Sequence, residues 1–284
     1  MNDKGIITLA VGKKYNRQAK YLARSCILHC PSLPRAIITD DCAYFKGLYD
    51  VVIQYTADMG NPFEVKLKLH LFTPFPETLF LDSDTLVYSD LRFMWECFDE
   101  NSIVYTGNCV TAGEWYVNIS QVLKHFNINW LPVFNSGIFL FKKDKNSAEI
   151  MNYAAKLYKN HDGIEVPYFR GKMLPDEPFF SIALAKFNQT PATNNYGRFG
   201  CSLIDAKRVK LNVTKGIAIF AKYDETVFPA IVHFVGGFIG RYFYFTEKLR
   251  LKFYFNSLDD LFSAIIAPIF YGLEFVKRKI KNRR

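Results

Sequence analysis

The sequence predicts an α/β protein whose central sheet is mostly parallel, doubly wound and Rossmann-like. Strand and helix patterns alternate near the amino terminus. Residues 6–11, 36–39 and 51–53 are rich in β-branched and other apolar side chains, and residues 16–30 have the spacing of an amphipathic helix. Farther along, an apolar run leads directly into a pair of aspartates. Such β-α-β alternation is typical of doubly wound sheets, which bind ligands at the carboxyl edge of their strands.

The pair of aspartates, Asp82 and Asp84, follows the apolar residues 79–81, and an apolar run resumes after Thr85. A continuous apolar run is typical of a buried strand, so we expect both carboxylates to emerge at its end. Two carboxylates one residue apart can share a hard divalent cation such as Mg²⁺ or Mn²⁺, and that cation could hold a diphosphate. The alternative is a solvated acidic strand end, because a D-x-D triplet alone is common.

The remaining elements are predicted from apolar periodicity and from the positions of proline and glycine. We expect helices at residues 64–72, 91–98, 147–158 and 179–187, strands at 103–105 and 231–234, an interrupted apolar run at 133–141, and an active-site loop at 106–117. No internal repeat or low-complexity linker divides the chain. We therefore expect one catalytic domain, residues 1–255, and a carboxyl-terminal helical appendage, residues 256–284.

Composition limits the classes of protein that fit. Half of the 284 residues are hydrophobic and 17% are aromatic, so a sizeable core is expected and extensive disorder is not. The formal net charge is +9, with much of the excess in residues 277–284. This basic end is either a solvated tail or a segment attracted to phosphates on a nucleotide or an anionic membrane. Nucleic acid is not an expected partner, because the basic residues form no aromatic-interleaved platform.

The six cysteines are scattered without a C-x-x-C pair. This argues against a zinc or redox motif and is typical of buried free thiols in a reducing compartment. We find no signal peptide pattern and no apolar stretch of the roughly 18 residues that a membrane span requires. The sequence therefore predicts a cytoplasmic protein, with peripheral attachment to the cytoplasmic membrane face as an additional expectation.

The order of the polar motifs resembles that of nucleotide-diphosphosugar glycosyltransferases of the GT-A fold, most closely the glycogenin and galactosyltransferase-like family 8. The resemblance extends over about residues 5–240 and rests on several short motifs in the same order. These are the first strand with Ala10, Gly12 and Tyr15, a lysine at Lys66, the D-x-D strand, the N-S-G motif Asn135-Ser136-Gly137, the pair Asp176-Glu177, and the H-F-x-G motif from His233 to Gly236.

The resemblance implies a metal site and a nucleotide site. Asp82, Asp84 and His233 would bind Mn²⁺ or Mg²⁺, with Ser83 beside the bound nucleotide, and the metal would neutralise the departing diphosphate. For His233 the alternative is a buried histidine at a strand end. Ala10 and Gly12 would lie at the nucleotide. Further binding residues are Tyr15, to stack on uracil, and Asp40 or Asp41, to accept from the base or ribose; the alternatives are a core tyrosine and a turn aspartate.

The other motifs would surround the phosphates and the sugar. Lys66 is a point charge suited to phosphate, and Asn135, Ser136 and Gly137 would let backbone approach the ligand closely, unless they form a simple turn. Asp176 would bind the transferred sugar or the acceptor, or else cap a helix. Two departures from the family pattern stand out. Glu177 replaces a glutamine, and Arg241 follows the H-F-x-G motif where the family has a lysine before Pro-Trp.

The resemblance implies a hexosyl- or pentosyltransferase that moves a sugar from a UDP-sugar, with retention, onto a glycan, protein or lipid-linked acceptor. Asp176, Glu177 and Lys66 would be its catalytic residues. Double displacement requires a nucleophile about 5 Å from the acid, and no such pair is evident in the sequence. We therefore expect front-face attack, in which the leaving phosphate takes the proton of the acceptor and the protein orients both substrates.

Two other functions fit parts of the sequence. Phosphatases of the haloacid dehalogenase type also carry D-x-D after an apolar strand, but that strand opens their domain and their threonine is spaced differently. A non-catalytic sugar-nucleotide binding protein is the second alternative, although intact Asp82, Asp84 and His233 argue against lost activity. Residues 258–284 combine an apolar stripe with a basic end. We expect either a helix packed on the catalytic domain or an interfacial helix on an anionic membrane.

Overall fold

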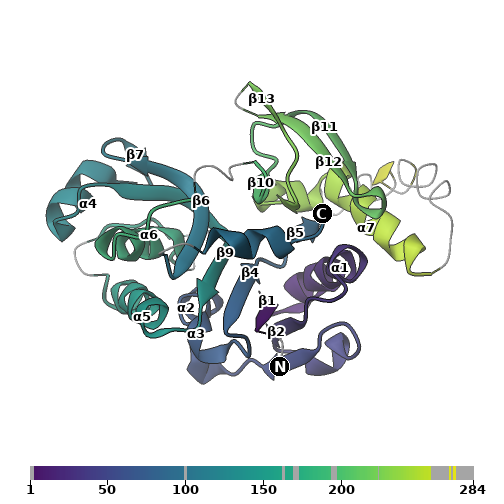
Figure 1. Ribbon diagram of the computed structural model, residues 1–284, viewed down its shortest axis with the longest axis horizontal. Helices are drawn as coiled ribbons and strands as arrows, with labels where there is room; N and C mark the ends of the chain where they lie inside the picture. Colours follow the sequence, from purple (N-terminus) through teal and green to yellow (C-terminus); the bar gives the residue numbers. More distant parts are fainter. Residues whose placement is uncertain are drawn as a thin grey trace, which may run out of the picture. The chain divides into compact units, whose positions relative to one another are not determined.

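The structure is a computed structural model that describes residues 3–98, 101–161, 164–168, 173–192, 197–222, 224–256, 269 and 271–272 (Figure 1). The chain divides into two compact units. Unit 1 consists of Met1–Ala19, Ser32–Ser83 and Arg92–Tyr196, and unit 2 consists of Lys20–Pro31, Asp84–Leu91 and Gly197–Arg284.

Unit 1 contains a six-stranded mixed sheet in the order β3-β2-β1-β4-β9-β6. The strands from β3 to β4 are parallel to one another, and β9 is antiparallel to both β4 and β6. Their bounds are β1 Lys4–Ala10, β2 Arg35–Thr39, β3 Val51–Gln54, β4 Glu77–Leu81, β6 Ile103–Val110 and β9 Leu131–Lys142. The prediction of a mostly parallel α/β sheet is confirmed, and its first strands lie where the β-branched runs placed them.

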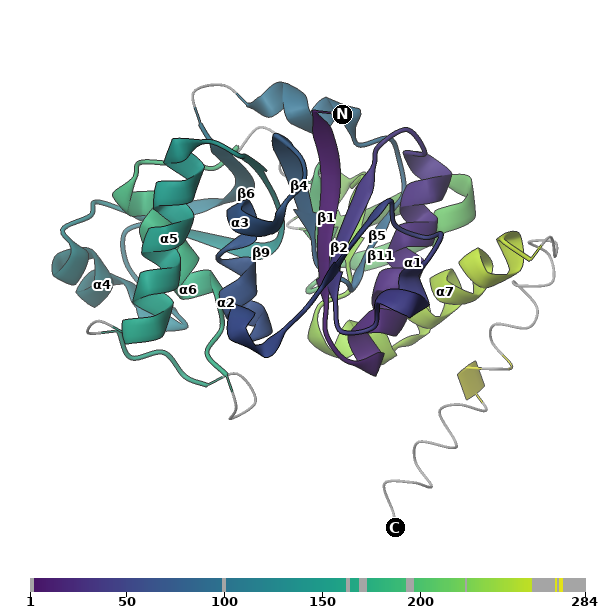
Figure 2. The ribbon, with the colours of Figure 1, turned by 90° about the horizontal axis from the view of Figure 1, so that it is seen from below.

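Helices follow the strands in unit 1. Their bounds are α2 Pro62–Lys66, α3 Leu69–Phe72, α4 Ile119–Phe126, α5 Lys145–Asn160 and α6 Glu177–Lys186, with short 3₁₀ helices η1 Cys42–Phe45, η2 Ala57–Met59 and η3 Arg92–Cys97. Helix α5 packs against α6, and α6 packs against β9 (Figure 2). The ring of Phe139 on β9 lies 5.1 Å from the rings of Phe80 and Phe180. Apolar packing between sheet and helices therefore fixes the strand ends that carry the polar motifs.

Unit 2 contains two small sheets and most of the longest helix, α1 Lys13–His29. Their strand orders are β10-β14-β5 and β11-β12-β13. The bounds are β5 Thr85–Val87, β10 Gly200–Ser202, β11 Lys207–Asn212, β12 Ile217–Lys222, β13 Glu225–Val227 and β14 Ile231–His233, followed by α7 Tyr242–Tyr254 and the 3₁₀ helices η5 Val213–Lys215 and η6 Gly236–Gly240. Its core consists of buried side chains of β5, β12, β14 and α7, including Phe220 and Tyr244, together with Phe234, which follows β14.

Several predicted elements differ from those observed. The helix expected at 64–72 is two short helices, α2 and α3, and the helix expected at 91–98 is the 3₁₀ helix η3. The run at 133–141 is one continuous strand: residues 131–134 pair with β6 and residues 138–142 pair with β4, on either side of the N-S-G motif. The loop expected at 106–117 begins as part of β6 and then forms a small hairpin of β7 Glu114–Trp115 and β8 Val117–Asn118.

The remaining expectations concern the cysteines and the carboxyl terminus. Cys26, Cys30 and Cys201 are buried, but Cys109 is exposed, so the expectation of buried thiols holds for only part of the set. Among the described residues, no helix has the length and apolar character needed to cross a membrane. Most of the predicted appendage, residues 256–284, lies outside the described residues.

Candidate active site

The end of β4 places Asp82 within unit 1. The last pair between β4 and β9 joins Leu81 to Ile138, and the next backbone N–H, that of Asp82, donates to the carbonyl of Gly137 at 2.9 Å. The D-x-D motif and the N-S-G motif are therefore neighbours across two strands. This position is at the carboxyl edge of β4, where the sequence predicted that the acids would emerge.

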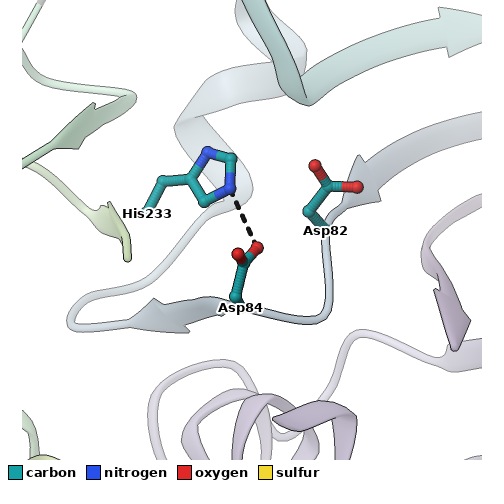
Figure 3. Close-up of side chains that lie close together, drawn as sticks. All are labelled: Asp82, Asp84 and His233. Carbon is teal, nitrogen blue, oxygen red and sulfur yellow. Dashed lines mark hydrogen bonds and ion pairs between the residues drawn. The ribbon is translucent and has the colours of Figure 1, made fainter. Parts of the chain in front are cut away.

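Asp84 and His233 are brought together by the sheet of unit 2. His233 pairs with Thr85 across the antiparallel strands β14 and β5, and the backbone N–H of Phe234 donates to the carbonyl of Asp84 at 2.9 Å. Nε2 of His233 lies 2.9 Å from Oδ1 of Asp84, as the dashed line in Figure 3 marks. The histidine is buried and the aspartate is partly exposed.

Asp82, Asp84 and His233 together form a group that could hold a metal ion. One ligand atom from each of the three lies within 4.8 Å of the others (Figure 3). Only Ser83 separates the aspartates, and strand pairing fixes the histidine beside Asp84, so local geometry accounts for the group. Two carboxylates and an imidazole suit Mn²⁺ and tolerate Mg²⁺. The chemistry of these donors therefore fits the metal that the sequence predicted.

Lys66, at the end of α2, is the centre of a buried charged cluster in unit 1. Its Nζ lies 3.2 Å from Oδ2 of Asp82, 2.9 Å from Oγ of Ser136 and 3.3 Å from Oδ2 of Asp176. The ammonium also lies 5.0 Å from the centre of the Phe80 ring. Burial alone would lower the pKa of Lys66, but the carboxylates of Asp176, Asp82 and Glu177 outweigh burial and raise it. Lys66 is therefore a permanent cation beside the D-x-D motif.

Asp176 belongs to this cluster and is almost fully buried. It is the N-cap residue of α6 by position, but its side chain makes no capping hydrogen bond, so the helix-cap interpretation holds for its position and not for its carboxylate. Oδ2 of Asp176 accepts no hydrogen bond, and its ion pair with Lys66 is its recorded contact. A buried carboxylate with spare acceptor capacity is a suitable partner for a ligand hydroxyl.

Glu177 joins the N-S-G motif to the same cluster. Its Oε1 accepts from Nδ2 of Asn135 at 3.0 Å and from the backbone N–H of Ser136 at 3.1 Å. The backbone N–H of Gly137 donates to Oδ1 of Asn135 at 3.1 Å. Burial, followed by repulsion from Asp176, raises the pKa of Glu177 despite the nearby Lys66 and a hydrogen bond from Tyr116. The motif is therefore part of a connected polar network on β9 and not a simple turn.

Tyr116 is a member of this network that the sequence analysis did not identify. Its hydroxyl lies beside the carboxylate of Glu177, although 61 positions separate the two residues in the chain. The sequence signal available was an aromatic pair, Trp115-Tyr116, within an otherwise polar loop.

The predicted nucleotide residues lie at the ends of β1 and β2. Gly12 follows β1 with a left-handed φ of 95°, and its N–H donates to both carboxylate oxygens of Asp40, at 3.0 and 2.9 Å. Nδ2 of Asn16 also donates to Asp40. Burial would raise the pKa of Asp40, but these hydrogen bonds outweigh it and lower the pKa. Asp40 is therefore an ionised carboxylate whose hydrogen bonds link the ends of β1 and β2. These bonds already use part of its capacity to accept hydrogen bonds.

The other predicted residues have distinct surroundings. Ala10 is buried in β1, and Tyr15 is 43% exposed, so Tyr15 is not a core tyrosine. Asp41 accepts from the backbone N–H of Tyr44 and caps η1. Ser83 is buried and donates to Gln18 at 3.2 Å. Gly236, with φ of 57°, begins η6, and the exposed Arg241 lies over the ring of Phe238 at the start of α7.

Comparison with known proteins identifies the fold. No family model and no curated protein sequence matches the chain. Solved structures do match. The galactosyltransferase LgtC, crystallised with donor and acceptor sugar analogues, is 15% identical with a TM-score of 0.55, over 82% of this chain and 87% of that one. A glutamine-to-glutamate active-site mutant of LgtC has a TM-score of 0.56 at 15% identity over the same shares of each chain.

A further match is the bifunctional glycosyltransferase WbbM, with a TM-score of 0.50 at 13% identity, over 82% of this chain and 45% of that one. The chain therefore has the GT-A fold of family 8-like glycosyltransferases, as the resemblance implied. At these identities the likeness establishes the fold alone.

Proposed function

We propose that the protein is a metal-dependent glycosyltransferase that moves a sugar from a UDP-sugar onto a glycan, a protein or a lipid-linked acceptor. The observation that carries this proposal is the convergence of Asp82, Asp84 and His233, with ligand atoms within 4.8 Å of one another, on a glycosyltransferase fold. A solvated acidic strand end would not require a buried histidine hydrogen-bonded to one of its acids.

The three residues would hold Mn²⁺ or Mg²⁺ through two carboxylates and one imidazole nitrogen. Such an ion, when bound, supplies Lewis-acid stabilisation of the charge that develops on a departing diphosphate. Lys66 contributes a second positive charge beside Asp82. Since Lys66 is buried and preorganised, little reorganisation is needed when negative charge accumulates next to it.

The remaining cluster would position the sugar and the acceptor. Asp176 has an oxygen available for a hydroxyl, and Glu177 is held by Asn135 and Ser136. We infer that these residues orient the reacting hydroxyl groups. The wild-type chain has glutamate at 177, where the family resemblance expects glutamine, and LgtC has been studied with a glutamine-to-glutamate change in its active site. Contacts to the sugar hydroxyls should therefore differ between this chain and the family pattern.

We infer that transfer retains the anomeric configuration by front-face attack. The bond between the anomeric carbon and the diphosphate oxygen breaks, a bond to the acceptor oxygen forms on the same face, and the proton of the acceptor passes to the departing phosphate. Asp176 pairs with Lys66, and Glu177 accepts hydrogen bonds from Asn135, Ser136 and Tyr116, so neither stands as an isolated nucleophile. An inverted linkage in the isolated product, read by NMR coupling constants, would contradict this mechanism.

The nucleotide would bind where β1 and β2 end. Tyr15 exposes its ring for a uracil, and Ala10 and Gly12 bring backbone to this edge, as we expect for the family. Asp40 and Asp41 remain candidates for the base and ribose, although their recorded hydrogen bonds already engage Gly12, Asn16 and Tyr44. Gly236 and Arg241 are further candidates for contact with the phosphates, as expected from the family position.

The basic, apolar sequence of residues 258–284 supports a second part of the proposal: peripheral attachment to an anionic membrane on its cytoplasmic face. A lipid-linked or membrane-bound acceptor would be reached there. Deleting residues 258–284 should abolish sedimentation with vesicles that contain phosphatidylglycerol or phosphatidylserine. Unchanged sedimentation of the truncated protein would contradict this part alone.

The first experiment is a panel of UDP-sugars, with UDP release measured with and without Mn²⁺. We expect release from one donor, dependent on the metal and lost in Asp84→Ala. Asp205→Asn is a matched control, because Asp205 is an exposed aspartate of the same unit. Silence across the panel, together with no UDP binding by calorimetry, would contradict the proposed donor class. UDP binding without turnover would instead identify a sugar-nucleotide binding protein.

The phosphatase alternative finds less support. In a phosphatase of this type the acidic strand would be the first strand of the domain, whereas β1, β2 and β3 all precede β4 in this chain.

A further inference from the structure

The hairpin of β7 and β8 has an unusual tip. Trp115 pairs directly with Val117 across the two strands, so Tyr116 alone forms the turn. Its φ is 37°, in the left-handed region that non-glycine residues rarely occupy. Glycine would fit this position without strain, and a bulky tyrosine stands there. Residues held in such conformations persist only where the surrounding structure fixes them, and they cluster at functional sites.

The base of the hairpin is firmly attached to unit 1. Val117 and Ile119 are buried in its core. The backbone N–H of Ile119 donates to the carbonyl of Gly113 at 3.0 Å, and Oδ1 of Asn118 accepts from the N–H of Gln121 to cap α4. The Trp115 ring packs edge-on against the Tyr116 ring, with centroids 5.1 Å apart. The tyrosine at the tip is therefore positioned by its neighbours and is not an unrestrained loop side chain.

The two ends of the Tyr116 side chain have different surroundings. The residue is 39% exposed, while its hydroxyl lies beside the carboxylate of Glu177. Burial of the hydroxyl, then the carboxylates of Glu177 and Asp176, raise the pKa of Tyr116, which keeps the phenol protonated as a donor. An aromatic ring with a solvent-exposed face and a hydroxyl held in place at its end is suited to an amphipathic ligand.

The carboxylate that holds this hydroxyl belongs to the candidate active site. Glu177 also accepts from Asn135 and Ser136, and the next residue, Asp176, is paired with Lys66. Tyr116 thus carries an exposed aromatic surface to the polar cluster assigned to the sugar and the acceptor. A pyranose ring presents an apolar C–H face and a rim of hydroxyls, which match an aromatic surface bordered by amide and carboxylate groups.

We propose that Tyr116 is a specificity-determining residue whose ring supports a pyranose while its hydroxyl positions Glu177 for that sugar's hydroxyls. This inference rests on the proposed function and adds to it the surface that the sugar contacts. The chemistry is shared by the sugar of the donor and the terminal sugar of the acceptor, and the two are separated by experiment.

The test compares wild type, Tyr116→Phe and Tyr116→Ala. In the donor arm, calorimetry measures Kd for UDP and for the UDP-sugar that wild type hydrolyses, both with Mn²⁺. In the acceptor arm, methyl glycosides are offered with that donor, and KM and kcat are obtained from product detected by mass spectrometry. Tyr254→Ala is the control, because Tyr254 is an exposed tyrosine on α7 in unit 2. Circular dichroism checks that each variant is folded.

For Tyr116→Ala we expect UDP affinity within twofold of wild type, with about a tenfold loss in one arm. A loss in Kd for the UDP-sugar assigns the platform to the donor sugar, and a rise in KM for the glycoside assigns it to the acceptor. Tyr116→Phe keeps the ring, so it should retain most of the binding and lose kcat through a misplaced Glu177.

If Tyr116→Ala has the Kd, KM and kcat of wild type in both arms, the inference is overturned and the proposed function is left intact. If wild type accepts none of the methyl glycosides, an unchanged Kd for the UDP-sugar alone overturns the inference. A fall in UDP affinity equal to the fall in UDP-sugar affinity would also overturn it, since the effect would then not concern the sugar. Absence of UDP release by wild type would instead remove the proposed function, and this inference with it.

Discussion

Each unit of the protein buries a cluster of charge, and the two clusters are built differently. In unit 1, Lys66 is surrounded by Asp82, Asp176 and Glu177. In unit 2, a single carboxylate, Glu247 on α7, is surrounded by donors. It accepts from the Tyr88 hydroxyl at 3.2 Å and from the backbone N–H of Val213, and it pairs with Nε of Arg250 at 3.1 Å.

The difference lies in what each cluster leaves unsatisfied. Three carboxylates face one ammonium in unit 1, Oδ2 of Asp176 accepts no hydrogen bond, and the side chain of Asp82 is 32% exposed. Oε2 of the buried Glu247 carboxylate accepts hydrogen bonds from Tyr88 and Val213, and its Oε1 forms the ion pair with Arg250. A surplus of negative charge at an exposed edge is suited to binding cations and hydroxyl groups. A carboxylate whose oxygens already have protein partners instead holds the backbone and side chains around it in place. Buried charge alone therefore does not mark a functional site; unused bonding capacity does.

Removing the lysine should have the largest effect. Lys66→Met leaves buried carboxylates without their counter-ion, so we expect a loss of about 3–5 kcal/mol in the free energy of unfolding. Metal-dependent UDP release should fall by about 10²–10³-fold. Urea titration and the release assay measure the two effects.

Lys68→Met is the matched control for this change. Lys68 pairs with Glu64 four residues earlier, and both side chains are partly exposed, so we expect a change below about 1 kcal/mol and near-wild-type activity. Equal losses in the two variants would show that the Lys66 cluster is no more than another ion pair.

Glu247→Ala should break the second cluster while leaving the first intact. The substitution leaves the Val213 N–H, the Tyr88 hydroxyl and Arg250 without their shared acceptor. We therefore expect a loss of about 2–4 kcal/mol in the free energy of unfolding. Activity per folded molecule should stay within twofold of wild type at a temperature where the variant is folded. An activity loss comparable to that of Lys66→Met would contradict the distinction between a structural and a functional cluster.

The pH dependence of stability provides a smaller signal. Burial raises the pKa of Glu247 to about 7, against the stabilising effect of Arg250 and the other donors on the ionised form. The unfolded chain releases this proton near its ordinary pKa of 4.5, so between about pH 4.5 and 7 the folded state binds more protons. Stability contributed by this group is therefore complete below pH 4.5, declines as the pH rises to about 7, and is level above it.

Glu247→Gln cannot ionise and should remove that decline. The measurement is the midpoint of urea unfolding from pH 4.5 to 8 for wild type and variant. Parallel curves for the two proteins would contradict the raised pKa of Glu247.

Tyr88→Phe should give the smallest effect. It deletes one hydroxyl from the Glu247 cluster and leaves the buried ring in place. Because Val213 and Arg250 still satisfy the carboxylate, we expect a loss of about 1 kcal/mol in thermal or urea unfolding. A loss as large as that of Glu247→Ala would show that the hydroxyl, and not the backbone N–H, is the main partner.

The sequence was informative where a local pattern determines the structure. Strands β1, β2 and β3 begin and end close to the predicted runs, because continuous β-branched segments have few alternatives to a strand; β1 and β2 are also largely buried. The positions of Asp82 and Asp84 followed from the same pattern, since an apolar strand must end before its polar residues.

Tertiary contacts determined what the sequence did not reveal. Asn135, Ser136 and Gly137 interrupt the apolar pattern, yet they remain in β9 because the residues before them pair with β6 and the residues after them pair with β4 and β6. The contact of Tyr116 with Glu177 joins residues far apart in the chain and has no periodic signature. Helix α7 was not among the predicted helices, because aromatic residues occur on several of its faces and obscure the helical period.

The contact between Lys66 and Asp82 bears on the order in which ligands bind. One of the carboxylates offered to a divalent ion already has an ammonium 3.2 Å away, so a free ion competes with a fixed cation for the same negative charge. A diphosphate removes this conflict, because both cations attract it. Thermodynamic reciprocity then requires that metal and nucleotide strengthen each other's binding by the same factor. We expect the two to load together, and the free protein to have little affinity for either ligand alone.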